Sequence, residues 1–404
     1  GINTSNDERR KKIIENLVNK GLKNEEFISY LRECKRNIYK RFDHYNKKEF
    51  YYNKIKKRMD AYKAKDYDSA NVYNKSKGTV NIDGTNIKLQ SSSNSVYSIR
   101  NYNGVVNIDN ATLGSSKSIY NESGTINING SNLTGNVKNI SSAVINIGKI
   151  NSDNLTTMSS NIDNTDSDIF IYNGSTVSGI ISTYKGNIYA YKGSITYGIE
   201  NRSGFVEIYG TVYGSDRSVY NFGSDASVVG VKIYEGSVIN NTIENYKGSI
   251  EIYGGTLNKI SNDLQGTINI RNAAIDNIKN AGIINMYSGS ILSSDEAVVN
   301  ERKFNLYGGS VESTASSAIS SASGSSVTNI GTKGDVDESN NLVISNESPI
   351  VKGKDYGILA KSGQVNFYDG KIIGKKSISG DLYSTEIGYD TVTIIDADEN
   401  EVTY

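Results

Sequence analysis

Four residue types are scarce in this chain, and each scarcity excludes something. The 404 residues include one Pro, one Cys, one His and no Trp. The single Cys34 excludes an internal disulfide framework, and beyond His44 there is no histidine for acid–base chemistry or metal binding. No apolar run reaches membrane-spanning length. Glycine (39) and tyrosine (29) are abundant, and this composition is typical of many short strands separated by tight turns.

Charge is unevenly distributed along a chain whose net charge is zero. Residues up to Lys65 hold 19 Lys and Arg against 9 Asp and Glu, so the remainder is acidic. This asymmetry predicts a domain boundary near Asp66. Capping-box patterns and apolar residues at helical spacing predict that residues 1–66 form a basic α-helical segment, which we expect to cap the next domain. Its basic faces are either solvated or contact an anionic polymer or membrane surface.

One phrase recurs from Tyr73 onward. It reads Ile119-Tyr-Asn-Glu-Ser-Gly-Thr-Ile-Asn-Ile-Asn-Gly130 and returns as Ile199-Glu-Asn-Arg-Ser-Gly-Phe-Val-Glu-Ile-Tyr-Gly210. Successive copies start 16 to 26 residues apart, most near 20, a period that is typical of a solenoid. Because Ile and Val alternate with polar residues, each copy predicts short half-buried strands. We therefore expect a parallel β-helix of about 13 coils stacked at about 4.8 Å over residues 67–376. Residues 377–404 are expected to form a C-terminal cap or the start of a further domain.

In most copies an asparagine stands two positions after an inward Ile or Val. Asparagine tolerates a left-handed backbone at a corner, and its amide can bond the same amide one coil away. A stacked asparagine ladder is therefore predicted. Its members are Asn74, Asn101, Asn121, Asn139, Asn201, Asn221, Asn245, Asn262, Asn280 and Asn300. Glycine corners are predicted at Gly174, Gly193, Gly236, Gly255, Gly289 and Gly309.

These motifs resemble two groups of known proteins. The asparagine ladder and the coils of about twenty residues resemble the right-handed parallel β-helix of the pectin-lyase-like superfamily. The Tyr-x-Gly-Ser/Thr-Ile/Val phrases resemble repeats of Gram-positive bacterial cell-surface and adhesin proteins. The resemblance covers about three quarters of the chain. It implies a right-handed coil, and a fold that serves lyases, hydrolases, tailspikes and adhesins alike.

Catalytic patterns of that superfamily are missing from the repeat. Its hydrolases carry paired Asp residues, a Gly-His-Gly and an Arg-x-Lys, whereas the repeat has no histidine. Its lyases combine Ca²⁺-binding carboxylates with an Arg or Lys base, and no such combination is visible. We therefore expect no catalytic residues and no cofactor. Three acidic loops could hold Ca²⁺, and Asp163, Asp166 and Asp168 form the first of them. Residues 335–338 and 396–399 contain the others.

A stripe of tyrosines is predicted on the outside of the later coils. The position after the second inward residue of a strand is Tyr in most of them, with Arg271 interrupting, and equivalent positions stack in a column. The predicted ligand-binding members are Tyr189, Tyr209, Tyr234, Tyr253, Tyr287 and Tyr307, with Tyr172 and Tyr368 in equivalent positions. Such rings either bind sugars or partner side chains, or they cover the corner and stabilise it through cross-coil pairs.

These features predict a non-catalytic structural or adhesin-like module, extracellular or on a bacterial surface. Its expected partner is a glycan or a host or cell-surface protein along the outer face. Nucleic acid is not expected, because the repeat is acidic, and membrane attachment would come only through an anchor outside this chain. The alternatives are a polysaccharide-acting enzyme, a lyase more than a hydrolase, and a phage or injection-system fibre.

Overall fold

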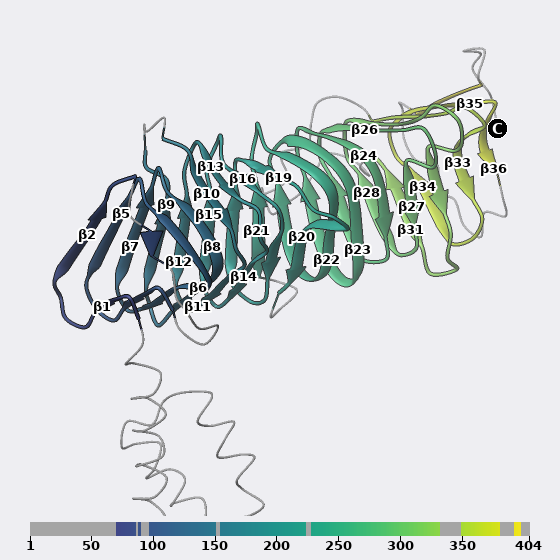
Figure 1. The fold of residues 1–404 in the computed structure, drawn as a ribbon. Coiled ribbons are helices and arrows are strands. Elements are labelled where there is room, and N and C mark those ends of the chain that lie inside the picture. The colour runs from purple at the N-terminus through teal and green to yellow at the C-terminus, as the bar shows by residue number, and fades with distance from the viewer. Residues whose placement is uncertain are drawn as a thin grey trace, which may run out of the picture. The chain divides into compact units, whose positions relative to one another are not determined.

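The architecture of this protein comes from a computed structural model, which describes residues 70–85, 88–89, 97–150, 154–223, 228–331, 349–379 and 392–396 (Figure 1). The chain divides into two compact units, Gly1–Ser69 and Ala70–Tyr404. The helices expected within residues 1–66 lie outside the described residues. Most of the expected C-terminal segment 377–404 lies outside them too.

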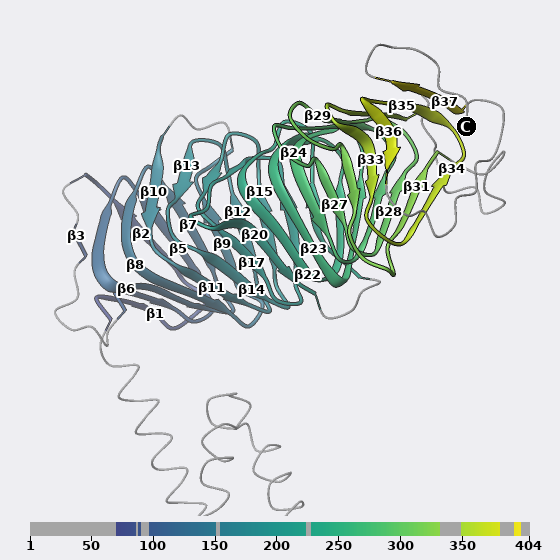
Figure 2. The ribbon, with the colours of Figure 1, turned by 90° about the vertical axis from the view of Figure 1, so that its right-hand side faces the viewer.

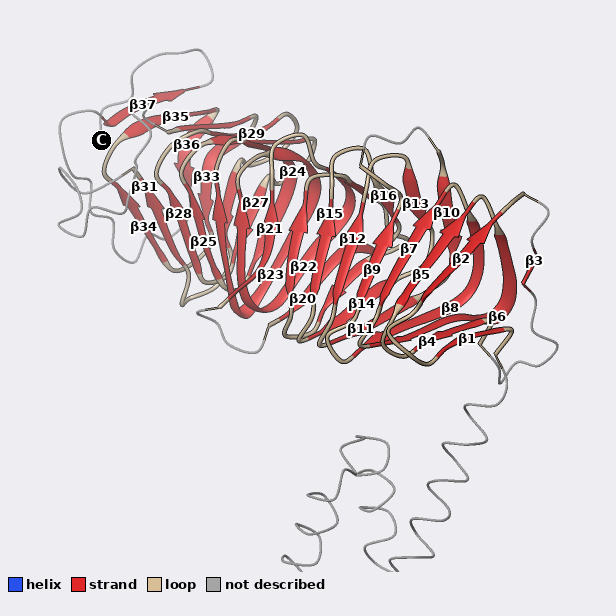
Figure 3. Cartoon of the chain, turned by 90° about the vertical axis from the view of Figure 1, so that its left-hand side faces the viewer, coloured by secondary structure: helices blue, strands red, loops and turns tan. Residues whose placement is uncertain are grey.

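The described part of the second unit is an all-β parallel solenoid of about 12 turns, close to the expected 13. Each regular coil has three strands, and each strand pairs in parallel with its equivalent one coil away. For example, β12 pairs with β15, β13 with β16 and β14 with β17. The strands consequently stack into three faces along one column, as Figures 1 and 2 show. Figure 3 shows strands and loops throughout the described residues, with no helix.

Strands of the three faces follow one another in chain order. The first face contains β2 (Thr79–Asp83), β5 (Val105–Asp109), β7 (Thr125–Asn129), β9 (Val144–Ile147), β12 (Asp168–Ile171), β15 (Asn187–Ala190), β18 (Phe205–Ile208), β21 (Val229–Ile233), β25 (Ile283–Met286), β28 (Lys303–Leu306), β31 (Val327–Ile330) and β34 (Gln364–Phe367). The second face contains β3 (Lys88–Leu89), β10 (Thr156–Ser159), β13 (Ser175–Val177), β16 (Ile195–Thr196), β19 (Thr211–Val212), β26 (Gly289–Ser293), β29 (Ser310–Ser313), β32 (Ile350–Gly353), β35 (Gly370–Gly374) and β37 (Val392–Asp396). The third face contains β1 (Val72–Asn74), β4 (Ile99–Asn101), β11 (Ile162–Thr165), β14 (Ile181–Tyr184), β17 (Ile199–Asn201), β20 (Arg217–Phe222), β27 (Val298–Asn300), β30 (Ile319–Ser321), β33 (Tyr356–Ala360) and β36 (Lys376–Ser379). Five longer strands continue round a corner: β6 (Thr112–Glu122), β8 (Asn132–Ile140), β22 (Val238–Ile252), β23 (Gly255–Ile270) and β24 (Ala273–Asn280).

Alternating side chains of all three faces build one continuous core. In β7, Ile126 and Ile128 are fully buried while Thr125 and Asn127 are half-buried on the outside. A single apolar cluster runs from Ile82 to Ile372. Burying an aliphatic side chain of this size stabilises the fold by roughly 1.5–3 kcal/mol, so each coil needs its neighbours to cover the open ends of its apolar side chains.

The predicted asparagine ladder is confirmed on the third face. The amide Nδ2 of Asn101 donates to Oδ1 of Asn121 at 2.9 Å, and Asn121 donates to Asn139 at 2.9 Å. The same step repeats from Asn201 through Asn300. The ladder begins at Asn74 and also includes Asn164, which the sequence reading missed.

Two details of the ladder differ from expectation. The ladder asparagines do not adopt left-handed backbone; in several coils the positive φ falls two residues later, for example at Ser123 (φ 62°), Ser141 (φ 62°) and Ser203 (φ 82°). The Asn side chain instead turns toward the corner, where Nδ2 of Asn121 also donates to the carbonyl of Gly124 at 3.0 Å. A Cβ on Gly124 would lie 2.3 Å from Nδ2 of Asn101, so the glycine of the phrase keeps space for the amide of the preceding coil.

Glycine corners occur where they are predicted. Gly174, Gly193, Gly236, Gly255, Gly289 and Gly309 all have positive φ, between 74° and 108°. At Gly309 a Cβ would also lie 2.4 Å from the carbonyl oxygen of Gly289 one coil away. Only glycine fits such a position without strain.

A second asparagine ladder runs along the outside of the first face. Nδ2 of Asn127 donates to Oδ1 of Asn107 at 2.8 Å, and Asn146 donates to Asn127 at 2.7 Å. It reappears from Asn269 to Asn366. These amides donate toward the preceding coil, whereas the buried ladder donates toward the following coil. The two ladders therefore run in opposite directions along the same column.

The buried ladder generates a prediction about stability. Replacing Asn121 by Ala leaves Oδ1 of Asn139 without its donor in a site from which water is excluded. We expect the free energy of unfolding to fall by on the order of 2 kcal/mol, the typical cost of an unsatisfied buried polar group. The measurement is the urea midpoint of the Asn121→Ala variant. Asn127→Ala in the same coil is the matched control, because water can replace its half-buried partner, and equal losses in both variants would contradict the prediction.

Candidate functional site

The tyrosine column lies at the corner where the first face ends. Seven tyrosines and one arginine occupy it in successive coils, and their backbone amides make equivalent bonds to the coil before. Its residues are Tyr172, Tyr191, Tyr209, Tyr234, Tyr253, Arg271, Tyr287 and Tyr307. The rings stack face to face: the centroids of Tyr209 and Tyr234 are 4.2 Å apart with 3° between their planes. Arg271 fills its place with its guanidinium 4.4 Å from the centroid of Tyr287.

The structure changes one member of the predicted column. Tyr189 lies two positions earlier, in the middle of β15, where it pairs in register with Phe170 and Glu207 and stacks on Phe170 at 4.9 Å. Tyr191 occupies the corner instead. The prediction failed there because Ala190 is the second inward residue of this strand, and a small residue is a weak sign of burial in a sequence. The other five named tyrosines are in the column.

Stacking decides what the column offers to a ligand. Each ring covers a face of its neighbour, so the exposed parts are ring edges and hydroxyl groups. Burial raises the pKa of several phenols above the ordinary 10.0, namely Tyr172, Tyr191, Tyr287 and Tyr307. At Tyr234 burial is again the largest cause of the raised pKa, followed by hydrogen bonds with Tyr209 and Glu207. The hydroxyl of Tyr234 donates to Oε1 of Glu207 at 3.0 Å.

The three candidate calcium ligands do not gather into a metal site. Asp163 is exposed in the middle of β11, Asp166 is in the following turn with φ 51°, and Asp168 begins β12. Oδ1 of Asp168 accepts a hydrogen bond from Asn187 at 2.8 Å. Within the described ranges no group of three or more His, Cys, Asp or Glu side chains could hold a metal ion. The second loop and the side chains of the third lie outside those ranges.

A groove of about 530 Å³ lies on the third face, along strands β17, β20, β22, β23 and β24. We call it the flank groove. Its floor consists of the outward residues that directly precede the ladder position in successive coils. Parallel register stacks them one above another, and they are Glu200, Tyr220, Glu244, Ser261 and Lys279. Ile180 and Tyr197 border it on one side.

Arg217 organises the centre of the flank groove. Its guanidinium lies 3.1 Å from Oε2 of Glu244 and 3.7 Å from Oε1 of Glu200, two coils apart. The same group stacks on the ring of Tyr220 at 4.0 Å. Arg202 and Ser182 also bond Oε2 of Glu200, at 3.0 and 3.3 Å. Charge and stacking therefore hold the two carboxylates and the guanidinium in fixed positions.

Two exposed tyrosines stand beside the groove. Tyr197 is 44% and Tyr213 37% exposed, and their centroids are 5.2 Å apart with the planes tilted by 32°. Register places Ser178 in the equivalent position one coil before and Asn240 one coil after. This pair is therefore not enclosed by further rings, unlike the tyrosine column.

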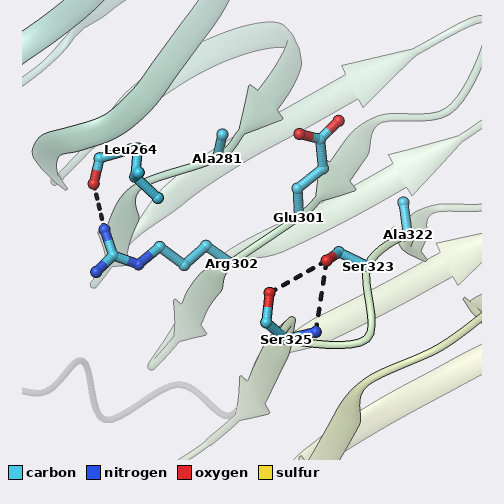
Figure 4. Close-up of a pocket in the computed structure, with 7 residues that line it drawn as sticks. All are labelled: Leu264, Ala281, Glu301, Arg302, Ala322, Ser323 and Ser325. Carbon is cyan, nitrogen blue, oxygen red and sulfur yellow. Dashed lines mark hydrogen bonds between the residues drawn. The ribbon is translucent and has the colours of Figure 1, made fainter.

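A smaller hollow of about 360 Å³ lies beyond the corner at the end of the third face (Figure 4). Arg302 crosses it and donates to the carbonyl of Leu264, while Ser323 and Ser325 bond each other at 3.1 Å. Glu301 on its wall pairs with Lys279 of the flank groove at 3.5 Å. Arg302 is engaged by a backbone carbonyl and Glu301 by Lys279, which leaves little for a ligand.

The sequence reading missed the flank groove although its signal was present. Glu200 and Glu244 stand directly before the ladder residues Asn201 and Asn245, and Tyr197 and Tyr213 each precede a glycine after the second face. Aligning these outward positions coil by coil would have revealed both columns. These residues are up to 82 positions apart in the sequence, as between Tyr197 and Lys279, so their proximity in space is not obvious from the sequence.

Fold and ladder together define the class of this protein, a parallel β-solenoid with an internal asparagine ladder. No protein-family model matches the chain, and comparisons with curated proteins and with solved structures find no match. Among the described residues, none forms a helix long and apolar enough to cross a membrane.

The raised phenol pKa values of the tyrosine column predict a dependence on alkaline pH. A phenol whose pKa is above 10.0 in the fold holds its proton more tightly there than in the unfolded chain. The corresponding stability is present below pH 10 and is lost as the pH rises through the folded-state values. We expect absorbance titration of the native protein to show a group of tyrosines that ionise later than those of the urea-unfolded chain. Tyr234→Phe, which keeps the ring stack, should reduce that late component by one phenol; identical native and unfolded titrations would contradict this.

Proposed function

We propose that this protein is a non-catalytic structural or adhesin-like module, secreted or on a bacterial cell surface, that binds a glycan or protein along the outside of its solenoid. The observation that carries the proposal is the flank groove, where exposed aromatic rings adjoin a fixed network of carboxylates and a guanidinium. Aromatic rings with polar groups in fixed positions are what recognition of a hydroxyl-rich or polar surface requires.

The same network argues against the enzymatic alternative at this position. A glycosidase needs one protonated and one ionised carboxyl on either side of the scissile bond. Here a single guanidinium contacts both Glu200 and Glu244, which suits binding of a ligand more than transfer of a proton. A lyase or hydrolase remains the alternative function, and product formation tests it.

Our proposal includes a right-handed coil of the pectin-lyase-like type and a relation to Gram-positive surface proteins. Coils of about twenty residues and the buried asparagine ladder support the first. The recurrent Tyr-x-Gly-Ser/Thr phrases support the second. A solenoid suits such a role because each coil adds length and surface without changing the core.

Binding to a glycan array and to immobilised cell-surface proteins, with the whole chain as probe, tests the proposal. We expect retention on at least one glycan or protein and no release of soluble sugar during incubation. Soluble products, including unsaturated ones from uronate polymers, would replace the proposal by the enzymatic alternative. A stable trimer in light scattering would favour the fibre alternative.

The tyrosine column is a second proposed binding surface in the same experiment. A variant with Tyr209, Tyr253 and Tyr307 changed to Ala should lose retention if ring edges and hydroxyls of the column contact the ligand. Unchanged retention would assign the column to corner stabilisation, since cross-coil aromatic pairs stabilise the stack by about 0.5–1.5 kcal/mol each.

A further inference from the structure

We infer that the flank groove binds a short segment of a neutral glycan, with Tyr197 and Tyr213 as its stacking platform and the Glu200–Arg217–Glu244 network as its hydroxyl-binding site. This inference rests on the proposed function and names the ligand class. It differs from a site for uronates or other anionic polymers, and from a site on the tyrosine column.

Charge balance of the groove excludes an anionic ligand as the best fit. Six charged side chains line it, three of each sign: Glu200, Asp216, Glu244, Arg217, Lys259 and Lys279. The guanidinium that an anion would need is already shared between two carboxylates, and Lys279 pairs with Glu301 at 3.5 Å. With three charges of each sign, and with Arg217 and Lys279 already paired, the groove offers a uronate no net positive charge, whereas its carboxylates repel one.

Hydroxyl groups suit the same network. A sugar hydroxyl both donates and accepts, and vicinal hydroxyls require a donor and an acceptor side by side. Glu244 is 32% exposed in its side chain and Arg217 41%, so both reach a ligand in the groove. Glu200, at 16%, is held by Arg202 and Ser182 and supports Arg217 from beneath. The stacking of Arg217 on Tyr220 at 4.0 Å fixes the guanidinium plane before any ligand arrives, which lowers the entropic cost of binding.

The platform supplies the apolar half of sugar recognition. Neutral sugars present C–H groups on one ring face, and these pack on an aromatic ring that is open on one side. Tyr197 and Tyr213 are open in this way, because Ser178 and Asn240 stand in the neighbouring coils. Ile180, 43% exposed, extends the apolar border of the groove. The groove volume of about 530 Å³ lies in the range of ~300–1,000 Å³ typical of small-molecule sites, so it takes a short oligosaccharide.

The deciding experiment compares neutral and acidic oligosaccharides on the intact chain. Probes are oligosaccharides of glucose, mannose and galactose, and an oligogalacturonate of equal length, titrated by calorimetry. We expect a neutral oligosaccharide to bind at least about tenfold more tightly than the uronate, a difference of about 1.4 kcal/mol. Binding should change little with salt, because no net charge is neutralised. Tighter binding of the oligogalacturonate would overturn the inference while leaving the proposed function intact.

Variants locate the site. Tyr197→Ala and Tyr213→Ala should each weaken binding of the neutral probe about tenfold or more, and Tyr197→Phe should retain it because the ring remains. Arg217→Gln should also weaken binding. Tyr246→Ala is the matched control and should bind as the parent does, because Tyr246 is as exposed as Tyr197 (44%) but does not line the groove. Urea midpoints check that the exposed substitutions leave the fold intact. Full binding by both Tyr→Ala variants would overturn the inference. If the parent chain bound no glycan and no protein at all, the proposed function would be overturned as well.

Discussion

The buried asparagine amide near the end of most third-face strands fixes how one coil sits on the next. Asn121 shows why: its Nδ2 donates along the axis to Asn139 and across the corner to Gly124, and its Oδ1 accepts from Asn101. A slip of two residues, which keeps the same side chains inward, would place an Ile or Val against these groups and leave several polar atoms unsatisfied in a dry core. Hydrophobic burial alone tolerates such slips, because Ile and Val are interchangeable along the column. The amide makes the register unique.

Where the ladder is interrupted, hydroxyl groups take its place. Asn164 donates to Oγ1 of Thr183 at 3.1 Å, and Asn300 donates to Oγ1 of Thr328 at 2.9 Å. Beyond Asn300 the equivalent positions are Ser321 and Ala360. The outer ladder continues through these last coils, so asparagine side chains still link neighbouring coils there after the buried ladder has ended. Side-chain amides thus link most of the described coils, in two sets that donate in opposite directions.

A fixed register turns outward positions into columns, and neighbours within a column determine whether a side chain is available. Identical aromatic residues in successive coils cover one another, as in the tyrosine column. A position that changes from coil to coil leaves side chains open, as at Tyr197 and Tyr213 or along the floor of the flank groove. We therefore propose that recognition belongs to places where the repeat varies, whereas uniform columns stabilise the stack.

The sequence by itself determined the parallel solenoid, the buried ladder and the glycine corners, because all three are set by spacing within one coil and repeat many times. It did not determine which coil positions are equivalent where a coil departs from the pattern. Tyr189 was placed one column wrong because Ala190 gives little sign of burial, and Asn164 was missed because Ser167 follows it where the quoted phrase has glycine, although the corner has the same geometry. The outward residues of the flank groove are visible in the sequence, but only the tertiary structure shows that they meet: Glu200, Arg217 and Glu244 come together because coils of unequal length, with a register shift between Arg217 and Val219, bring them to one place. Which residues share a column depends on how the coils stack, and the sequence of a single coil does not show it.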